Sequence, residues 1–137
     1  MTKAITPIAP SALLLATMLL AGCSQGGSPS ADDGRPAAFA QCATCHGVVP
    51  GARGIGPSLA GVFGAEAGHV SDYAYSEAMR ASGLVWNENA LNAYLDNPQT
   101  TVPGTKMSYR GLKDADQRAA VIDYLKTLGS DGELDGQ

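Results

Sequence analysis

The residues with the clearest chemical potential are Cys42, Cys45 and His46, which have the spacing Cys-X-X-Cys-His. Two residues between the thiols bring both sulfur atoms to one side of a single turn, and the next residue directs its imidazole toward the same centre. This is the spacing of covalent haem attachment, in which the thiols add to the haem vinyl groups and the imidazole binds the iron. The motif predicts one haem c, attached through Cys42 and Cys45, with His46 as an axial ligand.

Two other interpretations of this motif use the same residue types. A Cys-X-X-Cys pair can form a redox disulfide, and two thiolates with one imidazole supply three zinc ligands. A thioredoxin-like motif needs a strand before the cysteines, and the sequence offers none. A zinc site needs a fourth ligand, for which His69 is the only other histidine. We favour haem over both alternatives.

The second axial ligand of the iron has three candidates. An electron-carrying c-type haem commonly takes methionine or histidine there. Met79 lies in a short helical stretch that Ser76 can cap, where methionine is more often a packing residue, and His69 lies in a polar loop. Met107 ends a Pro-Gly-Thr-Lys-Met stretch, in which proline and glycine force a loop. Such a loop can cross the haem face opposite His46, so we expect Met107 to be the ligand.

The first residues resemble an export signal. Lys3 precedes an apolar stretch at residues 12–20, which is shorter than the roughly 18 residues that span a bilayer. The sequence Leu-Ala-Gly-Cys ending at Cys23 resembles the lipobox of bacterial lipoproteins, whose cysteine receives the lipid. We therefore expect residues 1–22 to be a lipoprotein signal peptide and residues 23–35 a lipidated, flexible linker. The alternative is an ordinary secretory peptide that leaves Cys23 as a free thiol.

Length and charge define the rest of the chain. The 137 residues allow one compact domain, which we place at residues 36–129, followed by a polar, flexible tail at residues 130–137. The net charge is −4, 16% of residues are charged, and lysine and arginine form no run. We therefore expect no nucleic-acid partner.

Two longer helices are predicted from capping residues and apolar stripes. Asn87 can cap the first helix, which Pro98 would end. Asp114, with Gln117 three residues later, can start the second, which Gly129 would end. The stripes are Leu91, Tyr94 and Leu95 in the first helix, and Val121, Ile122, Leu125 and Leu128 in the second. Because no strand pattern is present, the expected fold class is all-α.

With these motifs in place, the chain resembles the small one-haem cytochrome c family of mitochondria and bacteria. The resemblance covers about residues 39–128 and includes matching stretches at residues 56–64, 73–78, 82–86 and 94–98. It implies the cytochrome c fold, in which short helices wrap around one covalently attached haem.

The resemblance also implies roles for single residues. Pro57 would accept a hydrogen bond from the second ring nitrogen of His46, which orients the imidazole. Tyr94 would reach the Met107 sulfur. Three further residues would donate hydrogen bonds to the haem propionates: Tyr75 and Trp86 to one, and Thr105 to the other.

The chain departs from the family pattern in several places. Ala65 stands where relatives often have an arginine that compensates a buried propionate, and Met79 stands where asparagine is common. Arg53 is a possible substitute for that arginine. The first helix is short, with Pro36 as its expected first residue. Three positions where lysine is common in relatives are neutral here: Gln41, Gln99 and Thr100.

Together, these observations predict a monomeric carrier of single electrons without enzymatic activity of its own. Its partners would be extracytoplasmic redox proteins, themselves membrane-bound, and lipid on Cys23 would tether it to the membrane. One alternative is a permanent haem subunit of a larger oxidase or dehydrogenase. Another is an enzyme or gas sensor with an open iron site, which a Met107 ligand argues against.

Overall fold

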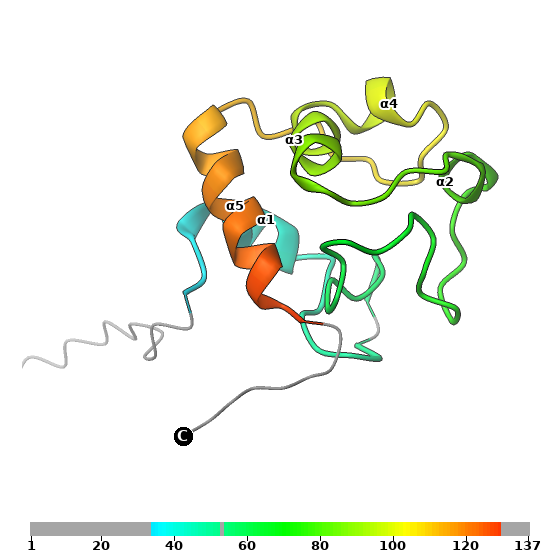
Figure 1. The fold of residues 1–137 in the computed structure, drawn as a ribbon, viewed down its shortest axis with the longest axis horizontal. Coiled ribbons are helices and arrows are strands. Elements are labelled where there is room, and N and C mark those ends of the chain that lie inside the picture. Colours follow the sequence, from blue (N-terminus) through cyan, green and yellow to red (C-terminus); the bar gives the residue numbers. More distant parts are fainter. Residues whose placement is uncertain (1–33, 53, 130–137) are drawn as a thin grey trace, which may run out of the picture. The chain divides into compact units, whose positions relative to one another are not determined.

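The computed structural model describes residues 34–52 and 54–129 (Figure 1). The predictions made for the signal peptide, for Cys23, for the start of the linker, for Arg53 and for the tail at residues 130–137 lie outside the described residues. Among the described helices, none combines the length and the apolar character needed to cross a membrane.

The described residues form a series of short helices joined by long loops. In chain order these are η1 (Ala37–Phe39), α1 (Ala40–Ala43), α2 (Glu77–Ala81), α3 (Glu88–Asp96), α4 (Pro98–Thr101) and α5 (Ala115–Thr127). The part of the chain that the structure describes has no strand, and a single isolated bridge pairs Glu66 with Val85. The all-α prediction is confirmed.

Three of these helices start at the residues that the sequence predicts. Ser76, Asn87 and Asp114 precede α2, α3 and α5, and all three have extended backbone angles. The side chain of each accepts a hydrogen bond from the backbone N–H three residues later, at 3.1, 2.9 and 2.9 Å respectively. These bonds satisfy N–H groups that have no partner inside the helix, so each cap stabilises its helix by about 1 kcal/mol.

The region around Pro98 contains a helix that the sequence pattern did not predict. Helix α3 ends at Asp96, as expected, but Pro98 then becomes the first residue of α4. Asn97 makes this possible, because its side chain accepts a hydrogen bond from the Thr100 N–H at 3.2 Å. Proline suits a first helical position, where its missing N–H would have no partner.

The first helix is as short as predicted, although its start differs. Pro36 is the residue before η1 rather than its first helical residue, because its backbone is extended. Within η1 only Phe39 is buried, and its ring packs edge-on against Tyr124 of α5, with ring centres 4.7 Å apart. This pair joins the two ends of the described chain.

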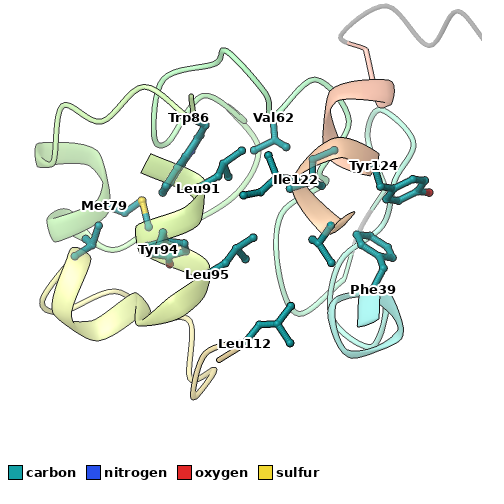
Figure 2. Close-up of a cluster of buried hydrophobic side chains, with 13 residues drawn as sticks. Phe39, Val62, Met79, Trp86, Leu91, Tyr94, Leu95, Leu112, Ile122 and Tyr124 are labelled. Atoms are coloured by element: carbon teal, nitrogen blue, oxygen red, sulfur yellow. The ribbon is translucent and has the colours of Figure 1, made fainter. Parts of the chain in front are cut away.

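Figure 2 shows how the buried side chains are distributed. Phe39 and Tyr124 lie at one end of the cluster, beside η1 and α5, and Met79, Trp86 and Tyr94 lie at the other. Helix α3 packs against both α4 and α5 and so links the two ends.

Candidate haem-binding site

The predicted site residues surround one cavity of about 270 Å³ in the described part of the chain. Nine of them line it: Cys42, Cys45, His46, Pro57, Tyr75, Trp86, Tyr94, Thr105 and Met107. The remaining wall is largely aliphatic and includes Leu59, Val62, Leu91, Leu95, Val121 and Leu125. Side chains from widely separated parts of the chain therefore meet around one apolar space.

Cys42 and Cys45 lie on a single turn that begins in α1. The backbone N–H groups of Cys45 and His46 both donate to the Cys42 carbonyl, at 3.0 and 2.9 Å. Both thiols are free of disulfides, and burial raises the pKa of the Cys42 thiol. A redox-active Cys-X-X-Cys pair needs a lowered thiol pKa, so this environment disfavours the disulfide interpretation.

The imidazole of His46 has a fixed orientation and tautomer. Its Nδ1 atom lies 2.8 Å from the Pro57 carbonyl oxygen. Because a carbonyl can only accept, Nδ1 carries the hydrogen in this contact. The lone pair on Nε2 then remains available for a metal ion. The contact that the resemblance implied between these two residues is present.

Gly56 is a site residue that the sequence pattern did not single out. A Cβ atom at this position would lie 2.6 Å from Nδ1 and 2.8 Å from Nε2 of His46, closer than carbon and nitrogen can approach. Its N–H also donates to the Cys45 carbonyl at 2.9 Å. The backbone at Gly56 therefore packs directly on the imidazole, and only glycine leaves room for it. The glycine that directly precedes Pro57 is the signal that could have identified this role.

Met107 contributes to the cavity from the loop that follows α4. Beside it, the buried Thr105 hydroxyl receives the Met107 N–H at 3.4 Å and lies 2.7 Å from the Tyr94 hydroxyl. Thr105 is thus a hydrogen-bond partner of Tyr94 among the described residues, and the contact of Tyr94 with the Met107 sulfur that the resemblance implies stays a prediction. One of the two hydroxyls donates in this contact, and the hydrogen of the other is available for a further acceptor.

The aromatic residues expected near the propionates also line the cavity. Trp86 is 6% exposed and packs against Tyr94, with ring centres 4.9 Å apart. Tyr75 is half-buried, and burial raises the pKa of its hydroxyl, which keeps it protonated and able to donate. Met79 is 6% exposed and His69 is exposed, and both also line the cavity. Cavity position alone therefore does not separate Met107 from these two other candidate ligands.

Comparison with known proteins identifies the family of this site. Residues 31–129 match the family Cytochrome c. The chain belongs to the cytochrome c family. The cytochrome is 50% identical over 93 residues to cytochrome c2 iso-2 of Magnetospirillum molischianum, a match that covers 68% of this chain and 96% of the relative. It is 40% identical over 95 residues to cytochrome c2 of Blastochloris viridis, which covers 69% of this chain and 75% of the relative.

Solved structures show the same relationship. Cytochrome cH from Methylobacterium extorquens matches with a TM-score of 0.62 and 44% identity, over 66% of this chain and 91% of that one. Cytochrome c2 from Rhodospirillum centenum matches with a TM-score of 0.63 and 32% identity, over 68% of this chain and 93% of that one. The cytochrome c fold is thus confirmed.

The site of the cytochrome fits one haem c, attached through Cys42 and Cys45. The two thiols share one turn, the imidazole of His46 is held by Pro57 through Nδ1 rather than Nε2, and the apolar wall suits a flat macrocycle. Bound haem supplies an iron that exchanges one electron reversibly. The cytochrome is accordingly an electron carrier, and its partners are other redox proteins.

Proposed function

We propose that this cytochrome carries single electrons between extracytoplasmic redox proteins, with its iron held between His46 and Met107. One observation carries the proposal: His46, oriented by Pro57, shares the apolar cavity with Met107, which lies on a loop, whereas Met79 is fixed within helix α2. Nitrogen and thioether ligands on one iron are the pair that electron-carrying c-type haems commonly use.

The residues of the chain account for fast transfer. His46 and Met107 as ligands, with thioether links through Cys42 and Cys45, would hold the haem in the same way in both oxidation states, so little would have to move. The thioether ligand favours ferrous iron, and the aliphatic wall disfavours the additional positive charge of the ferric state. The reduction potential is therefore expected to be positive.

The remaining residues around the cavity have supporting roles in this proposal. Tyr75 and Trp86, which line the cavity, would donate to one propionate and Thr105 to the other, while Tyr94 would order the loop through its contact with Thr105. Ala65 has no charge that could compensate a propionate, so in this proposal the hydrogen bonds from Tyr75 and Trp86 stabilise that propionate instead.

The proposal includes a lipid anchor at Cys23, supported by the sequence Leu-Ala-Gly-Cys and the apolar stretch before it. The ten linker residues 24–33, taken as a flexible chain, would have a typical reach of about 16 to 19 Å, which would keep the domain close to the bilayer. Its redox partners would then be membrane-bound, and the tether would raise the rate of encounter through effective concentration. Cys23→Ser should release the cytochrome from membranes with its absorption spectrum intact, and retention on washed membranes would contradict the anchor.

The iron ligation is tested by absorption spectroscopy of the oxidised protein. A methionine-to-iron bond gives a weak far-red band, which Met107→Leu should abolish while lowering the reduction potential. Met79→Leu is the matched control, because it changes the other methionine of the cavity and should keep the band. Loss of the band in Met79→Leu with retention in Met107→Leu would reverse the assignment.

A further inference from the structure

The side-chain amide of Gln99 bridges two carbonyl groups on the loop that carries Met107. Its Nε2 atom lies 3.1 Å from the Thr105 carbonyl oxygen and 3.2 Å from the Met107 carbonyl oxygen. An amide nitrogen has two hydrogens, so it can donate to both acceptors at once. One side chain thereby holds the loop on both sides of Lys106.

We propose that Gln99 is a positioning residue for Met107, which keeps the thioether on the iron by restraining the backbone of its loop. The proposal rests on the ligation of iron by Met107 given under Proposed function. It adds that dissociation of Met107 from the iron is limited by Gln99, a residue of α4 that is not itself a ligand.

Other hydrogen bonds hold side chains of this loop: the Thr105 hydroxyl lies 2.7 Å from that of Tyr94, and Lys106 donates to the Ala74 carbonyl at 2.8 Å. The Thr105 N–H donates to the Val102 carbonyl at 3.0 Å, and the Met107 N–H reaches the Thr105 hydroxyl only at 3.4 Å. For the carbonyls of Thr105 and Met107, the hydrogen bonds that the structure gives are those from Gln99. Loss of the amide would therefore free the two backbone carbonyls that flank Lys106, including that of Met107 itself, while the side-chain contacts of the loop remain.

Gln99 is itself held on a well-fixed element. The Asn97 side chain caps α4, and Pro98 is fully buried. The Thr101 hydroxyl donates to the carbonyls of Ala93 and Asn97, both at 3.0 Å, and so joins α4 to the end of α3. A side chain on such a base can position a ligand more accurately than a loop residue can.

The type of side chain matters as well as its position. Gln99→Glu keeps the shape but replaces the amide nitrogen and its two hydrogens with a carboxylate oxygen, which can only accept and would face two carbonyl oxygens. Gln99→Ala removes both hydrogen bonds without adding charge. Both variants should loosen the loop, and the glutamate variant at least as much as the alanine variant.

The experiment measures imidazole binding to the oxidised, matured cytochrome, because added imidazole reaches the iron only after Met107 leaves. Gln99→Ala should raise the imidazole association constant about tenfold or more, since two hydrogen bonds to the closed loop are lost. The far-red band should weaken in the same variant without external ligand.

Matched controls separate positioning from general destabilisation. Asn89→Ala and Asn89→Asp change an exposed amide on α3 that is outside the cavity, and should leave imidazole binding within about twofold of the parent. Asn87→Ala removes a helix cap and lowers global stability away from the loop.

Two results would overturn the proposal: an unchanged association constant in Gln99→Ala, or an equal rise in Asn87→Ala. Absence of the far-red band in the parent protein would instead refute Met107 ligation itself.

Discussion

The hydroxyl oxygens of Tyr94 and Thr105 lie 2.7 Å apart in the wall of the haem cavity, and both residues are buried. Tyr94 projects from α3, whereas Thr105 belongs to the loop that carries Met107. The pair therefore joins a helix of the core to the ligand loop. Each hydroxyl is the other's partner in a place with little access to water.

This pairing predicts a non-additive effect of removing the two hydroxyls. Tyr94→Phe and Thr105→Val should each lower the free energy of unfolding by about 1–3 kcal/mol, because each leaves one buried hydroxyl without its partner. The double variant should cost less than the sum of the two, with a coupling of about 0.5–1.5 kcal/mol. Denaturant unfolding of the four proteins measures this coupling. Strictly additive losses would show that the bond contributes nothing.

The same tyrosine predicts how stability depends on alkaline pH. Burial raises the pKa of Tyr94, and the hydrogen bond with Thr105 only partly opposes this. A hydroxyl with a raised pKa in the folded state contributes stability that is complete below its unfolded pKa of about 10 and is lost as the pH rises further. The free energy of unfolding should fall above about pH 10, and the fall should be shallower in Tyr94→Phe. The measurement compares the parent and Tyr94→Phe, both in the ferrous state. Parallel curves of the free energy of unfolding against pH would contradict this prediction.

The contact between Gly56 and the imidazole predicts a severe effect of a small substitution. Gly56→Ala would place a methyl group within 2.6 Å of His46 Nδ1, so the imidazole would have to leave its position beside Pro57. We expect little matured, haem-loaded protein, and a loss of several kcal/mol of stability in any that forms. Gly129→Ala is the control, since a methyl group there would meet open space. Normal yield and spectrum in Gly56→Ala would refute the packing argument.

The burial pattern in η1 predicts that Phe39 anchors this short helix to α5. Phe39 is fully buried against Tyr124, whereas Ala37 of the same helix is exposed. Phe39→Ala should lower the free energy of unfolding by about 3–5 kcal/mol, because a large ring leaves a cavity between η1 and α5. Ala37→Ser should change it by less than about 0.5 kcal/mol. Similar values for both variants would mean that η1 contributes little to the fold.

Local signals explain which parts of this fold could be predicted from the sequence. Ser76, Asn87 and Asp114 cap their helices through bonds within three residues, so each cap is visible in a short window of sequence. Pro98 was predicted only to end α3, yet it also starts α4. A proline cannot continue the helix before it, but it suits the first position of the next helix. Local pattern shows the first effect, but the second depends on Asn97 adopting a capping conformation.

The candidate site divides in the same way. The haem motif is one contiguous stretch of sequence, so the sequence alone placed Cys42, Cys45 and His46 near one centre. The Pro-Gly-Thr-Lys-Met stretch is likewise contiguous, and it identified Met107 as a residue on a loop. The role of Gly56 on the imidazole and the bridge from Gln99 to the ligand loop depend on segments that meet only after folding. The same holds for the hydroxyl contact between Tyr94 and Thr105, which are eleven residues apart in the sequence.

The rim of the cavity predicts a weak response to ionic strength. Gln41 is exposed, lines the cavity and accepts a hydrogen bond from the Tyr109 hydroxyl at 3.1 Å, so this part of the rim is neutral. The nearby Lys106 donates to the Ala74 carbonyl at 2.8 Å, which holds its charge at the side of the cavity. With few charges at the rim, the rate of electron transfer to the hexacyanoferrate(III) anion should change little with added salt.

A charge placed at this rim should change that response. Gln41→Lys should speed the reaction about two- to fivefold at low salt, and the gain should disappear near 1 M salt, where screening extends over only about 3 Å. Asn89→Lys adds the same charge on α3, outside the cavity lining, and should have a smaller effect. Stopped-flow rates over a range of ionic strength compare the three proteins. Equal gains in both variants would mean that the net charge of the protein, rather than the field at this rim, governs the approach of a redox partner.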